Sequence, residues 1–148
     1  MPDRLFIRAL VTFDISRNKL RTEATNALAD ALCDAAPALG ALSDVNLLGN
    51  HIGVERANKL VKLMESHRNL ETLCGFRGNE TELDLRGRYE SLGTGCGVLV
   101  ANEVRKIAGL TRLNVSAQSL GGHRDMHVGW VSDVAGVQAL AAAILECK

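Results

Sequence analysis

Residues 42–52 read LSDVNLLGNHI, and this stretch decides how the rest of the chain is interpreted. An asparagine, Asn50, follows apolar residues that stand at fixed positions: Leu42, Val45, Leu47 and Ile52. Side chains two residues apart on a strand point to one face, so Val45 and Leu47 predict a short strand with an apolar face. Such a strand cannot bury that face alone. The pattern therefore predicts neighbouring copies of the same unit.

Further copies of the pattern stand on both sides of this stretch. The clearest are residues 10–20, LVTFDISRNKL, and residues 110–120, LTRLNVSAQSL. Between them lies an irregular third unit, in which a short loop at Phe76–Thr81 takes the place of a helix. We therefore expect strands near residues 10–18, 42–50, 70–74 with 82–86, and 110–116.

Apolar residues at three- and four-residue spacing predict helices between the strands. We expect them at residues 22–39, 53–67, 98–107 and 133–146, with an insertion at 121–132. A chain of 148 residues is about one domain long. The prediction is a single domain over residues 1–148 with about four repeats.

Together, the strand motifs and the helices resemble the long-period leucine-rich repeats of the ribonuclease inhibitor class, from about Leu10 to Leu145. The resemblance implies an α/β solenoid shaped as a horseshoe, with parallel strands on its concave face and helices on its convex face. It also implies that an asparagine amide in each turn hydrogen-bonds the backbone of adjacent coils. Four residues stand at that position: Asn18, Asn50, Gln118 and, departing from the pattern, Arg88.

In such a horseshoe, the residues between the leucines project into the concavity. The partner-binding residues that the resemblance implies are Asp14, Ser16, Arg17, Asp44, Asn46, Leu48, Glu82, Asp84, Arg86, Arg112, Asn114 and Ser116. This surface is polar and mixed in charge, which suits a protein partner better than a phosphate backbone. The alternative interpretation of each residue is ordinary solvated strand surface.

Composition argues against several classes of partner. The 17 Lys and Arg residues balance the 17 Asp and Glu residues, so no global field favours nucleic acid or an anionic membrane. No apolar run approaches the roughly 20 residues that span a bilayer. The N-terminus, MPDRLFIRALVTFD, has an acidic residue at Asp3 and no small-residue cleavage site, unlike a secretory signal. We expect a cytoplasmic protein without nucleic-acid or membrane partners.

Three sequence patterns are candidates for chemical sites. In HRDMH, the alternation of His123, Asp125 and His127 could hold a metal, but no further ligand is marked, so a polar surface insertion is expected. Residues 91–97, SLGTGCG, lack the GK[ST] ending of a phosphate loop. The four cysteines form no C-x-x-C pair and are interpreted as small buried hydrophobes. We expect no catalytic residues, no metal and no cofactor.

The predicted function is a non-catalytic scaffold that binds a partner protein through the leucine-rich repeat surface. Two alternatives stay open: a regulator, inhibitor or activator, of an enzyme or small GTPase, and a structural subunit of a larger assembly. The last helix is followed by no closing strand. Uncapped solenoid ends expose apolar surface and strand edges, which predicts self-association or coverage by a partner.

Overall fold

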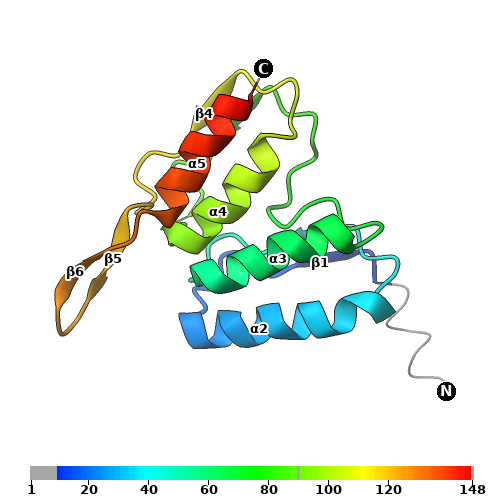
Figure 1. Ribbon diagram of the computed structural model, residues 1–148, viewed down its shortest axis with the longest axis horizontal. Coiled ribbons are helices and arrows are strands. Elements are labelled where there is room, and N and C mark those ends of the chain that lie inside the picture. The colour runs from blue at the N-terminus through cyan, green and yellow to red at the C-terminus, as the bar shows by residue number, and fades with distance from the viewer. Residues whose placement is uncertain (1–9, 90, 148) are drawn as a thin grey trace.

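The computed structural model describes residues 10–89 and 91–147, so most of the stretch judged for a secretory signal lies outside the described residues. Short strands alternate with helices along the chain (Figure 1). The elements are β1 (Thr12–Asp14), α2 (Thr22–Ala35), η1 (Ala36–Ala38), β2 (Asp44–Asn46), α3 (Val54–Ser66), β3 (Glu82–Asp84), α4 (Gly93–Val104), β4 (Arg112–Asn114), β5 (Gly122–Asp125), β6 (Gly129–Ser132) and α5 (Ala135–Glu146).

Within residues 10–89 and 91–147, the strands pair in three separate two-stranded sheets. β1 is parallel to β2, with Phe13 opposite Val45, and β3 is parallel to β4, with Leu83 opposite Leu113. β5 and β6 form an antiparallel hairpin in the stretch predicted as an insertion. The predicted horseshoe solenoid is therefore wrong, because the strands do not form one continuous sheet that could line a concave face.

The first parallel sheet ends at residues 72–74, which join β2 through isolated bridges between Asp44 and Thr72 and between Asn46 and Cys74. The backbone N–H of Val45 donates to the carbonyl oxygen of Thr72 at 3.0 Å. Side chains bind the backbone there instead of a further strand. The N–H of Leu73 donates to Oε2 of Glu103 at 3.2 Å, and the N–H of Cys74 donates to Oγ1 of Thr72 at 3.1 Å. Since these side chains satisfy the two donors, no further strand is needed to pair with them.

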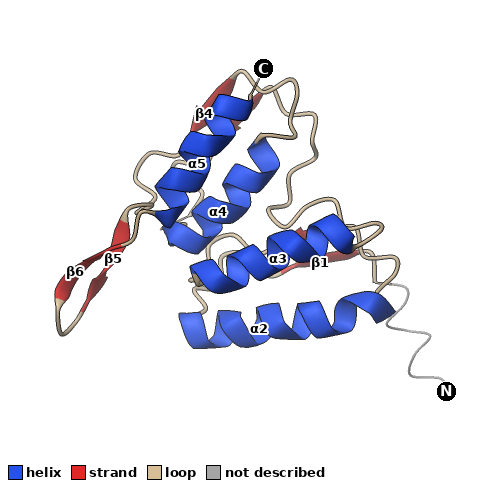
Figure 2. Cartoon of the chain, viewed as in Figure 1, coloured by secondary structure: helices blue, strands red, loops and turns tan. Residues whose placement is uncertain are grey.

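The helices form one layer in front of the parallel strands (Figure 2). Within this layer, α2 and α3 run side by side, whereas α4 and α5 run together in a different, steeper direction (Figure 1). Stacked coils of a solenoid would keep their helices roughly parallel. The change of direction thus agrees with the split between the two parallel sheets. None of the described helices is long and apolar enough to cross a membrane.

Glycines set the close approach of α4 to its neighbours. A Cβ atom on Gly97 would lie 3.1 Å from the Cα of Gly136, and one on Gly136 would lie 2.8 Å from the carbonyl oxygen of Thr94. A Cβ on Gly95 would overlap the carbonyl oxygen of Ile52. Residues 93–97, which precede the helix expected at 98–107, are therefore the first part of α4, where small residues permit tight packing.

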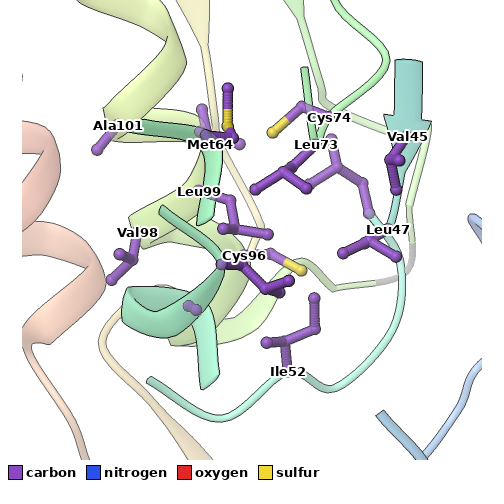
Figure 3. Packing of buried hydrophobic residues seen from close by; sticks show 14 of the residues in the cluster. Val45, Leu47, Ile52, Met64, Leu73, Cys74, Cys96, Val98, Leu99 and Ala101 are labelled. Carbon is purple, nitrogen blue, oxygen red and sulfur yellow. The ribbon is translucent and has the colours of Figure 1, made fainter. Parts of the chain in front are cut away.

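The core lies between the two layers (Figure 3). Val45 and Leu47 enter it from the first sheet with 0% and 2% exposure, and Leu60 and Leu99 enter it from α3 and α4. Cys74 and Cys96 are buried, as the sequence predicted for all four cysteines. The prediction is wrong for Cys147, which is exposed, and Cys33 is half-buried.

Candidate binding surfaces

Four of the residues expected to contact a partner share a structural role at the strand ends. Each side-chain oxygen accepts a hydrogen bond from the backbone N–H two residues ahead, at 2.9–3.2 Å: Asp14, Asn46, Asp84 and Asn114. This is the local turn that Asp and Asn form readily. These oxygens are thus already committed to closing the turn that follows each strand.

The expected surface is divided between two sheets. Asp14 lies beside Asn46 on the first sheet, and Asp84 lies beside Asn114 on the second. The other charged candidates on the second sheet form ion pairs. Arg112 pairs with Glu82 and Arg86 pairs with Asp84, each at 4.0 Å. Ser116 and Arg17 are exposed, whereas Ser16 and Asp44 are half-buried.

One expected contact residue, Leu48, is wrongly assigned, because its side chain is 0% exposed and belongs to the core. The neighbouring Gly49 explains this burial. A Cβ there would lie 2.8 Å from Cδ1 of Tyr89, so the segment after β3 folds onto this end of β2. Strand alternation alone could not reveal that cover.

The residue at the asparagine position of the repeat pattern makes different hydrogen bonds in different turns. Asn50 is buried and donates from Nδ2 to the carbonyl oxygens of Ile15 and Leu47, both at 3.0 Å. Gln118 is also buried and donates to the carbonyl oxygen of Leu85 at 3.2 Å. The exposed Asn18 bonds only within its own turn, and Arg88 is exposed. Cross-strand bonding of this type therefore occurs within each parallel sheet.

A cleft of about 240 Å³ opens where three turns meet, and we call it the basic cleft. Its walls come from the turns after β1 and β2 and from the segment between β3 and α4: Arg17, Lys19, Gly49, His51, Arg88, Tyr89 and Ser91. The guanidinium carbon of Arg17 lies 5.3 Å from the centre of the Tyr89 ring, within cation–π range. Partial burial raises the pKa of the Tyr89 hydroxyl, which stays protonated at neutral pH.

The hairpin of β5 and β6 projects away from the helices (Figure 1). Its turn and second strand expose large apolar side chains: Met126 by 97%, Val128 by 74% and Trp130 by 62%. Arg124 lies opposite Trp130 across the hairpin. The carboxylate of Asp125 accepts the N–H groups of His127 and Val128, which closes the turn and lowers the pKa of that carboxyl.

Helix α5 is apolar on both of its sides. Gly136, Leu140 and Ala143 are buried against the rest of the molecule. The opposite stripe is open to solvent, where Val137, Ile144 and Leu145 are 47%, 64% and 87% exposed. We call this stripe, with Ala141 between its ends, the outer stripe of α5.

The metal and phosphate hypotheses gain no support from the geometry. Across residues 10–89 and 91–147, no three His, Cys, Asp or Glu side chains converge as a metal site would require. Residues 93–97 are the start of α4 and serve helix packing. Burial raises the pKa of the Cys96 thiol to about 11, and the thiol donates to the carbonyl oxygen of Asn50 at 3.4 Å. A protonated thiol is a poor nucleophile.

A buried carboxyl group that sequence reasoning missed lies in α4. Glu103 is 4% exposed, and burial raises its pKa, although hydrogen bonds with Cys74, Thr72 and the backbone N–H of Leu73 act in the opposite direction. In the sequence, Glu103 looks like an ordinary solvated charged residue near the end of a helix. Only the contact with residues 72–74, distant in the sequence, reveals its role.

The basic cleft and the exposed hairpin were also missed, and only weak signals marked them. Arg17, Arg88 and Tyr89 stand in separate turns, and nothing in their spacing brings them together. The hairpin could have been suspected from Met, Val and Trp within a short stretch rich in glycine and histidine, which does not resemble a buried strand. No family model, curated protein or solved structure matches the chain.

Proposed function

We propose that this protein is a non-catalytic protein-interaction module, and that the outer stripe of α5 and the adjoining hairpin form its main contact surface. One observation carries the proposal. Only Gln138 and Glu146 are polar among the 12 residues of α5, a composition typical of a helix buried all round. Three of its large apolar side chains, Val137, Ile144 and Leu145, are nevertheless exposed. A partner that covers it would complete the burial.

The chemistry of the surface favours a protein over a lipid bilayer. A helix that lies on a membrane carries Lys and Arg along its polar face. The only charged residue in α5 is Glu146, which pairs with Arg105 at 3.3 Å. Trp, Met and Arg are the residues enriched at the centres of protein interfaces. Trp130, Met126 and Arg124 supply all three on one hairpin.

The partner implied by these side chains is a protein with an apolar groove and acidic groups at its rim. The groove would receive the outer stripe of α5 and the Trp130 ring. Acidic side chains would meet Arg124, whose own hairpin carboxylate, Asp125, is occupied by backbone N–H groups. Charge complementarity of this kind fixes the orientation of partners and speeds their association.

The test uses a photo-crosslinking amino acid placed at Val137 in the full chain, with the same residue at Ala27 on the exposed side of α2 as the control. We expect a discrete crosslinked protein from position 137 alone. The crosslink should map to apolar residues of the partner, and Arg124→Glu should abolish it. Because Arg124 is exposed, this substitution leaves the fold intact.

Other outcomes would overturn the proposal. Equal crosslinking from positions 137 and 27 would show non-specific contact. Crosslinks to lipid would point to a membrane surface, and crosslinks to a second copy of the chain would replace the partner with self-association. A product unchanged by Arg124→Glu would refute the predicted acidic rim.

A further inference from the structure

The basic cleft is lined by turns of both parallel sheets, and its chemistry differs from that of the apolar surface of α5. Three cationic side chains, Arg17, Lys19 and Arg88, line it together with the His51 imidazole. Among the ion pairs of residues 10–89 and 91–147, none involves Arg17 or Arg88. Two guanidinium groups without a carboxylate among these residues therefore face one small cavity.

We propose that the basic cleft binds a single oxyanion, a phosphate or carboxylate group. Guanidinium groups bind these planar or tetrahedral anions through paired N–H donors, with charge-assisted hydrogen bonds about twice as strong as neutral ones. The cleft offers two such groups, those of Arg17 and Arg88, and the Arg17 group lies over the Tyr89 ring. Its chemistry thus selects an anionic head group.

The size of the cavity limits the ligand. Sites for complete small molecules and cofactors usually have volumes of about 300–1,000 Å³. The basic cleft has about 240 Å³. It can therefore hold a head group, such as a free anion or the end of a single side chain, but not a complete nucleotide.

The backbone of the first turn shows why arginine at position 17 is informative. Arg17 has a left-handed φ of 60°, and the corresponding third residue after β2 and β3 is a glycine, Gly49 or Gly87, with φ of 80° or 72°. Ala117 after β4 adopts the same conformation, so the backbone belongs to the turn and is not itself a sign of a site. The first turn differs because it places a long cationic side chain at this position, where a glycine would be less strained.

Titration of the labelled full chain with inorganic phosphate, and separately with acetate, tests the proposal by amide NMR shifts at constant ionic strength. We expect saturable shifts at residues 17–19, 49–51 and 88–91 with at least one anion, and none with chloride. The phosphate and acetate arms distinguish the two possible head groups. Millimolar affinity corresponds to about 4 kcal/mol, as expected for a few charged hydrogen bonds.

The matched variants are Arg17→Asn with Arg88→Gln, against Arg112→Gln as the control. Asparagine tolerates the left-handed backbone at position 17. We expect the double variant to bind the anion at least about tenfold more weakly, while Arg112→Gln binds normally. If the double variant loses its native spectrum, Arg88→Gln alone supplies the same comparison. Absence of saturable shifts with either anion, or equal affinity in the variants, would overturn the proposal without affecting the α5 surface.

Discussion

The side chain of Asn50 links the turn after β2 to the carbonyl oxygen of Ile15 at the end of β1, with an Nδ2 to oxygen distance of 3.0 Å. The same amide donates to the carbonyl oxygen of Leu47, and its Oδ1 accepts the N–H of Leu20 at 3.1 Å. Asn50 is 2% exposed. One buried amide therefore satisfies backbone groups from both strands of the first sheet, where water has little access.

Replacing Asn50 by alanine should lower the free energy of unfolding by about 1–3 kcal/mol, because the backbone groups that it serves would be left buried and unpaired. Asn18→Ala is the control. Its amide is exposed and bonds only within its own turn, so water can replace it. Urea unfolding followed by circular dichroism measures both variants. Equal losses from the two substitutions would contradict the role assigned to Asn50.

Replacing Gly95 by alanine should destabilise the protein by about 1–3 kcal/mol or more, because the added methyl group meets the backbone carbonyl of Ile52. That oxygen belongs to the main chain and cannot move aside like a flexible side chain. Gly40→Ala provides the comparison, since a Cβ there has no heavy atom within 4 Å. A thermal midpoint for Gly95→Ala as high as that of Gly40→Ala would show that α4 can shift away from residue 52.

Replacing Glu103 by glutamine should raise stability at neutral pH. Burial holds the pKa of Glu103 above its ordinary value, so the native state binds the proton more tightly than the unfolded chain does. The resulting stabilisation is fully present below the pKa that Glu103 has in the unfolded chain. It is lost as the pH rises through the higher pKa that Glu103 has in the folded protein. Glutamine stays neutral and still offers an oxygen to the N–H of Leu73.

Urea midpoints of the wild type and of Glu103→Gln, measured between about pH 4 and pH 8, give the required comparison. The two proteins should converge at acid pH and separate as the pH rises, with the variant more stable. Glu65→Gln, on the exposed side of α3, controls for the loss of one negative charge. A constant difference across the range would mean that the carboxyl is not buried as the structure places it.

The sequence located several elements because their signals are local. The alternation of Val45 with Leu47 indicated a strand, which the structure places at Asp44–Asn46, and the helical spacing from Val54 to Met64 indicated α3. Both inferences depend on residues within about one turn of structure. The cross-strand hydrogen bond of Asn50 was instead implied by the family resemblance.

The errors arose where distant residues decide the outcome. The continuous horseshoe was wrong because Glu103 and Thr72 satisfy the backbone at residues 72–74. Gly95 and Gly97 looked like turn residues, because their role appears only when Ile52 and Gly136 pack against them. No local pattern encodes such contacts, so neither the sheet break nor the basic cleft could be derived from the strand motif.

The break between residues 72–74 and β3 also has a mechanical meaning. Within each parallel sheet, backbone hydrogen bonds resist distortion, but no such ladder joins one sheet to the other among the described residues. The two helix pairs meet where α3 packs against α4, while Gly75 and Gly78 lie in the connecting segment with left-handed φ values. We therefore expect the two halves to twist relative to one another more readily than either half deforms internally. A ligand that touched both halves would set the angle at which they rest.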